Sequence, residues 1–158
     1  MPSLMPGMPG TKEAFAISKI KDDLALRIPP KAISHYNISE EDFVILTTGH
    51  IGESGFGMIK KETALKSVFK KFVKEIKNCE EILMPNDRAF VMLKIDNGVT
   101  RLTKDVLKAF YLKIGDRLMV GKSTTVTMSF VPVEIWENKF KKHGFYEAIE
   151  NMKKLEEY

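Results

Sequence analysis

The sequence of 158 residues has only one cysteine, one tryptophan and three histidines. A single cysteine, Cys79, excludes an internal disulfide and fits a reducing compartment, so we expect a cytoplasmic protein. No apolar run approaches the ~20 residues that a membrane-spanning helix needs, so no membrane partner is expected. Residues 1–12 contain three prolines and two glycines but no apolar segment typical of a signal peptide, which predicts a flexible N-terminal arm.

The signatures of common enzyme classes are missing as well. His35, His50 and His143 have no metal-ligand spacing with one another or with Cys79. The glycine-rich segment Gly49–Gly57 is neither a P-loop nor a dinucleotide-binding fingerprint, because no Gly-Lys-Ser/Thr closes it and a strand follows it. We interpret it as a hairpin tip in which glycines adopt positive φ. The sequence therefore predicts no catalytic residue, no metal site and no cofactor, in a protein that is not an enzyme.

What the sequence does contain is an internal repeat with a period of 74 residues. Residues 26–33 align with residues 100–107, and an arginine stands second in each segment, Arg27 and Arg101. The hydrophobic positions match without a gap over 21 consecutive residues. Because a unit of about 75 residues buries little surface by itself, we expect the two units to share one core. The predicted organisation is a first repeat over residues 13–80 and a second over residues 87–158.

Both repeats predict the same order of elements. Two alternating segments indicate strands, and a short helix follows, begun by Pro29 and Pro30 in repeat 1 and capped by Thr103 in repeat 2. A turn then leads into a hairpin, with strands over residues 43–48 and 56–60, or 117–121 and 127–136. An amphipathic helix ends each repeat. Its apolar positions are Leu65, Val68, Phe69, Phe72 and Ile76 within residues 63–78, and Phe145, Ile149, Met152 and Leu155 near the C-terminus.

The run from Ile28-Pro29 through Asn37-Ile38 to Asp42 resembles the SpoVT/AbrB family of DNA-binding domains. In that family an Ile-Pro opens a short helix, and a Gly-Ile turn leads to the next strand. Asparagine also tolerates the left-handed backbone of this turn, whereas Tyr111 at the same place in repeat 2 is less comfortable. The tandem arrangement is similar to MraZ, whose units end much as Val133–Glu137 does before a helix. Over about residues 13–145, the resemblance implies a mainly β (α+β) fold in which two swapped-hairpin units form one pseudo-twofold β-barrel.

The resemblance further implies a DNA-binding surface. The family presents an Asp-x-x-x-Arg motif before the Ile-Pro, with the arginine directed toward DNA. Neither repeat keeps that motif, whose positions hold Lys21 and Ala25, or Ile95 and Val99. Arg27 and Arg101 lie two positions further on, which is the same face of a strand, so we take them as replacements. The predicted contacts to double-stranded DNA are Arg27, Arg101, Lys19, Lys21, Lys31, Lys104 and Lys108.

Two hypotheses for function remain open at this point. The first is a DNA-binding transcriptional regulator of the AbrB/MraZ type, acting as a homo-oligomer. The second is a protein-interaction or scaffold module that keeps the fold without the DNA contacts, with the two arginines forming structural salt bridges. A lysine-rich helix face either binds nucleic acid or an acidic protein, or is simply exposed to solvent. The net charge of +4 fits either hypothesis. That face comprises Lys66, Lys70, Lys71, Lys74 and Lys77.

Overall fold

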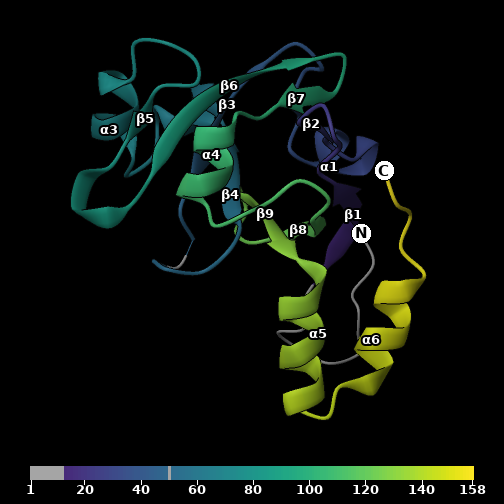
Figure 1. Ribbon diagram of the computed structural model, residues 1–158. Helices are drawn as coiled ribbons and strands as arrows, with labels where there is room; N and C mark the ends of the chain where they lie inside the picture. The colour runs from purple at the N-terminus through teal and green to yellow at the C-terminus, as the bar shows by residue number, and fades with distance from the viewer. Residues whose placement is uncertain (1–12, 50) are drawn as a thin grey trace.

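The computed structural model describes residues 13–49 and 51–158, and the flexible arm predicted for residues 1–12 lies outside this range. The expected mainly β fold is confirmed in its coarse form: one antiparallel sheet curls into a nearly closed barrel (Figure 1). The strands of the described residues are β1 (Ala14–Lys19), β2 (Ala25–Arg27), β3 (Phe43–Thr47), β4 (Phe56–Lys60), β5 (Ile82–Leu83), β6 (Phe90–Asp96), β7 (Val99–Arg101), β8 (Arg117–Lys122) and β9 (Met128–Pro132).

The strand order is β1-β8-β9-β4-β3-β6-β7-β2, with β5 paired to β6 beside this path. The two ends of the order approach each other, because the backbone N–H of Lys21 donates to the Ala25 carbonyl (3.0 Å). The Ser18 hydroxyl also donates to the Arg27 carbonyl, at 2.7 Å. These contacts between β1 and β2 bring the sheet close to a closed barrel, and they satisfy a buried hydroxyl that would otherwise lack a partner.

Strands of the N-terminal half pair with strands of the C-terminal half at four places: β1 with β8, β2 with β7, β3 with β6, and β4 with β9. In the β2–β7 pair, Leu26 lies opposite Thr100, which is 74 residues later. In the β4–β9 pair, Gly57 lies opposite Ser129. Inward-facing residues of both halves, including Phe56, Phe110 and Phe130, form one hydrophobic core in the barrel.

Two short helices follow β2 and β7 at matching places, α1 (Pro30–His35) and α4 (Lys104–Ala109). As predicted, prolines occupy the start of α1, and the Thr103 side chain caps α4 by accepting from the backbone N–H of Val106. After each helix the chain adopts a left-handed conformation, with φ of 52° at Asn37 and 56° at Tyr111. The turn geometry is therefore the same in both halves, although a tyrosine tolerates it less well than an asparagine.

The prediction of a single amphipathic helix over residues 63–78 is wrong. Two short helices replace it, α2 (Lys61–Ala64) and α3 (Lys70–Glu75). Ser67 explains the break, because its hydroxyl donates to the Ala64 carbonyl (2.7 Å) and accepts from the backbone N–H of Phe69 (3.1 Å). Val68 falls in this break and is 87% exposed, so it does not belong to the apolar face.

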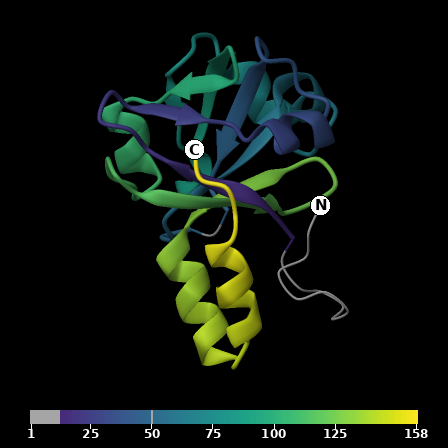
Figure 2. The ribbon, with the colours of Figure 1, turned by 90° about the vertical axis from the view of Figure 1, so that its right-hand side faces the viewer.

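The strand predicted over residues 127–136 is also too long. It ends at Pro132, where the helix α5 (Val133–Lys142) begins, and α6 (Tyr146–Lys153) follows. Pro132 lacks a backbone N–H and has the φ of −50° that suits a helix start, so the sheet gives way to a helix there. The helices α5 and α6 form an antiparallel pair that projects from the barrel (Figure 2). The predicted apolar face of the last helix is confirmed at Ile149 and Met152.

Both β1 and β6 have their remaining edge covered by a short segment. The strand β5 pairs antiparallel with β6, with Ile82 opposite Val91. Residues 156–158 run parallel to β1, where the N–H of Ile17 donates to the Glu156 carbonyl and the N–H of Tyr158 donates to the Ile17 carbonyl, both at 2.9 Å. Within the described residues, no helix has the length and apolar character needed to cross a membrane.

Candidate nucleic-acid interface

The β2–β7 pair places the two repeat-related arginines on one face of the sheet. Leu26 and Thr100, which lie opposite each other, point into the core and are fully buried. Because side chains alternate along a strand, Arg27 and Arg101 both point outward. Arg27 pairs with Val99 and Arg101 pairs with Ala25, so the arginines are diagonal neighbours on that outer face. Such neighbours lie roughly 7–8 Å apart in antiparallel sheets, close enough for one phosphate backbone to meet both.

The environments of the two arginines differ. The Arg101 side chain is 63% exposed, donates to the Asp23 carbonyl (2.9 Å) and lies 3.5 Å from the Asp23 carboxylate. The Arg27 side chain is only partly exposed and lies against Gly98, where an added Cβ would come within 3.5 Å of its guanidinium carbon. Arg101 is therefore displayed to solvent and loosely held, because an exposed ion pair contributes at most about 1 kcal/mol.

Arg27 also interacts with the segment that covers β1. The hydrogen bond from the Tyr158 hydroxyl to Glu156 raises the pKa of Tyr158, burial adds to this, and the positive charge of Arg27 partly opposes it. Arg27 Nε is buried and has no hydrogen-bond partner within residues 13–49 and 51–158. A buried guanidinium N–H without a partner carries a desolvation cost.

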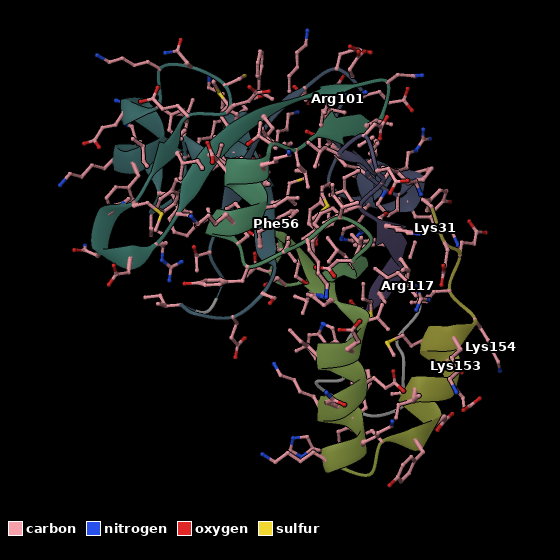
Figure 3. The ribbon with its side chains drawn as sticks, viewed as in Figure 1. Lys31, Phe56, Arg101, Arg117, Lys153 and Lys154 are labelled. Carbon is pink, nitrogen blue, oxygen red and sulfur yellow. The ribbon has the colours of Figure 1, made fainter. Side chains whose placement is uncertain are left out.

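The five predicted lysines are all exposed, but they do not form one cluster with the arginines. Figure 2 shows α1 and α4 on opposite flanks of the barrel, which separates the α1 lysine from the α4 lysines. Figure 3 shows Lys31 near Arg117 on the side of the C-terminus, whereas Arg101 lies toward the top of the sheet. The lysines are Lys19 and Lys21 at and after the end of β1, Lys31 on α1, and Lys104 and Lys108 on α4.

The structure adds two basic residues that the sequence interpretation missed, Lys94 beside Arg101 and Lys61 beyond Phe43 on the next strand. Continuing the β6–β7 register by one residue places Lys94 next to Arg101, on the outer face. Across β3, Lys94 lies opposite Phe43, and Lys61 Nζ is 5.5 Å from the centroid of the Phe43 ring. The alternation of the 90–96 segment indicated that Lys94 points outward. The Asn97-Gly98 turn between β6 and β7 was the signal that could have placed it beside Arg101.

Elsewhere, the Gly49–Gly57 segment connects β3 to β4 as expected, with positive φ at Gly52 and Gly55, while His50 lies outside the described residues. A cavity of about 600 Å³ opens beside this connection, and it is lined by Glu13, Glu53, Lys122, Trp136 and Lys139 among others. Its charged side chains are balanced in sign. In the part of the chain that the structure describes, no three His, Cys, Asp or Glu side chains come together to hold a metal ion.

In comparisons with known proteins, no family model, curated protein or solved structure matches this chain. The candidate interface therefore depends on the geometry of the barrel and on the charges of its outer face.

Proposed function

We propose that this protein is a DNA-binding regulator of the AbrB/MraZ type, in which two tandem swapped-hairpin units form one pseudo-twofold barrel. The observation that carries the proposal is the β2–β7 pairing, which puts Arg27 and Arg101 on one outer face around the Leu26–Thr100 pair. The pairing of strands from the two halves supports it, because interleaved hairpins would produce such pairings. The arginines contact duplex phosphates, and shape rather than base edges supplies selectivity.

Fluorescence anisotropy with a labelled duplex at about 0.05 M and 0.2 M salt tests this function. We expect binding at the lower salt concentration, weakening as salt rises, and a further loss when Arg27→Ala and Arg101→Ala are combined. Asp23→Asn is the matched control, because it frees Arg101 from its ion pair without removing a cation. It should leave binding unchanged or strengthen it. A protein that does not bind duplex at low salt contradicts the proposal.

A second candidate function is a protein-interaction module on the same fold. One observation favours it: Arg101 is held by Asp23, and Arg27 lies against Gly98, so both arginines also have structural contacts. This function predicts that the purified protein carries no nucleic acid. The absorbance at the nucleic-acid maximum should then be low relative to the absorbance at the protein maximum. It also predicts a defined homo-oligomer by light scattering, with a size that duplex DNA does not change.

A further inference from the structure

The positive charge of the chain is concentrated in one short segment. The whole sequence has 25 Lys and Arg residues against 21 Asp and Glu residues. Residues 61–78 contain six lysines and two glutamates, which equals the entire net charge of +4, and the remaining residues are balanced at 19 of each sign. This segment forms α2, α3 and the link between them on the outside of the barrel (Figure 1). A charge so confined requires an explanation beyond general solubility.

The lysines of α3 occupy one side of the helix. At about 100° per residue, Lys70, Lys71 and Lys74 fall within an arc of about 100°, and all three are exposed. The opposite side carries Val73, which is 2% exposed, and Phe72, which stacks on a core phenylalanine. The packing of α3 therefore fixes the direction in which these lysines project.

Few carboxylates neutralise this surface. None of the ion pairs among the residues described involves Lys70, Lys71, Lys74 or Lys77. Lys66 approaches Glu62 at 3.9 Å, with both side chains largely exposed. Glu75, at the end of α3, is the other acidic residue of the segment, and the exposed Glu80 and Glu81 follow it, with the Glu80 N–H bonded to the Met92 carbonyl of β6. The four lysines thus present a net positive charge to solvent.

The lysine surface and Arg101 lie along the same outer face of β6. One hydrophobic cluster joins Val73 of α3, and Ile76 just after it, to Phe90 and Met92 on that face. The next outward residue of β6 is Lys94, which lies beside Arg101. Figure 1 shows the same order, with α3 beside β5 and β6, and with β7 at the far end of β6. The seven residues of β6 span about 23 Å, a length of duplex that carries about 13 phosphates.

We propose that Lys70, Lys71, Lys74 and Lys77 extend the Arg101 face into one band that binds the phosphate backbone of double-stranded nucleic acid. This inference rests on the proposed function and names the principal phosphate contacts. Lysine is suited to this role as a flexible point charge without base-edge geometry. Single-stranded substrates fit the α3 lysines less well, because Phe69 and Phe72 pack inward against Phe90 and α3 offers no exposed aromatic ring beside them. An anionic membrane fits less well for a similar reason, since Val68 is the only large apolar side chain exposed within residues 61–78.

The test compares two variants with equal loss of charge. The band variant combines Lys70→Gln, Lys71→Gln, Lys74→Gln and Lys77→Gln. The matched control combines Lys141→Gln, Lys142→Gln, Lys153→Gln and Lys154→Gln on the α5–α6 pair, where Figure 3 shows the last two lysines far from Arg101. Glutamine keeps these positions soluble and favourable to a helix. Thermal unfolding by circular dichroism confirms that both variants fold.

The readout is the slope of log K against log salt for a duplex of about 30 base pairs. Each lost phosphate contact reduces the magnitude of this negative slope by about 0.9, so the slope of the band variant should be shallower by about 2–4. The variant should also bind at least about tenfold more weakly at low salt. The control should keep the wild-type slope. An unchanged slope in a folded band variant overturns this inference and leaves the Arg27 and Arg101 proposal standing.

Two further outcomes separate the remaining cases. If the band variant loses binding while Arg27→Ala with Arg101→Ala does not, the lysine band stands and the arginine contacts fail. Phosphatidylserine vesicles serve as the alternative polyanion. Binding of the wild type to those vesicles but not to duplex, lost in the band variant, assigns the lysines to membranes and overturns both proposals.

Discussion

The α2–α3 segment and the α5–α6 pair occupy comparable places in the two halves, yet they differ in length and charge. Each begins directly after a hairpin strand, and each packs on the outer face of the sheet, over Ile45 in one case and over Met119, 74 residues later, in the other. The N-terminal half has helices of four and six residues, and the C-terminal half has helices of ten and eight. The sheet positions beneath the two segments agree, while the helices that cover them differ in length and in which positions they bury.

The difference in charge is clearer than the difference in length. On α5 and α6, Lys141 pairs with Glu137 at 3.3 Å, and Lys153 pairs with Glu150 at 3.2 Å. Lys139 lies over the Trp136 ring at 5.1 Å. Among residues 13–49 and 51–158, the lysines of α3 have no comparable contacts. Two segments that cover equivalent sheet positions therefore differ in whether their lysines are paired, which is why we assign the lysines of residues 61–78 a partner.

The largest expected effect is on stability, and it distinguishes the two hydrophobic clusters on the outer face of the sheet. One contains Phe90 beneath α2 and α3, and the other contains Phe140 of α5. Phe90 is fully buried and meets Phe69 and Phe72 with ring centroids 5.5 Å and 5.1 Å away, so Phe90→Ala should destabilise the protein by about 3–5 kcal/mol. Phe140→Ala, in the other cluster, should cost a similar or smaller amount because Phe140 keeps 6% exposure. Hydrogen exchange should rise over residues 61–76 in the first variant and over 133–153 in the second. Exchange that rises equally in both segments would contradict independent clusters.

The next largest effect on stability concerns the C-terminal segment that covers the edge of β1. Residues 156–158 add three backbone hydrogen bonds to β1, including one from the Lys19 N–H to the Tyr158 carbonyl at 2.9 Å. At about 0.5–1.5 kcal/mol each, their deletion should lower the free energy of unfolding by about 2–3 kcal/mol in a urea titration. Arg117→Ala, which removes only the ion pair to Glu157, should cost less than about 1 kcal/mol. Equal costs for the two changes would show that the ion pair, not the strand, holds this segment.

The sequence predicted the parts of the fold that local chemistry determines. Pro30, Thr103 and the alternating apolar residues of the strands define their elements through φ restriction, capping and burial, and all appear in the structure. The prediction of one helix over residues 63–78 relied on regular apolar spacing. It failed because the hydrogen bonds of the Ser67 hydroxyl interrupt the helix there. Pro132 was a visible signal that the last hairpin strand ends there.

The candidate site was less predictable. The repeat put Arg27 and Arg101 at equivalent positions, and strand alternation gave their common orientation only once β2 was known to lie beside β7. Lys94 could have been placed beside Arg101 from spacing, because β6 and β7 form a hairpin closed by Asn97 and Gly98, both with positive φ. By contrast, the role of Asp23 as the partner of Arg101 depends on a contact between residues 78 positions apart.

The smallest expected effect concerns equivalent residues at the ends of α1 and α4. Phe110 is buried, whereas Tyr36, 74 residues earlier, directs its hydroxyl to the Thr127 carbonyl at 3.1 Å. Burial, with a smaller contribution from Glu13, raises the pKa of Tyr36 to about 12. Since the folded state holds this proton more tightly than an unfolded tyrosine with a pKa of about 10, the stabilisation is complete below pH 10 and is lost as pH rises through about 12. Tyr36→Phe should cost about 1 kcal/mol at neutral pH, from the lost hydrogen bond, and the gap to wild type should shrink in urea titrations at alkaline pH. A gap that stays constant with pH would show that Tyr36 ionises freely in the folded protein.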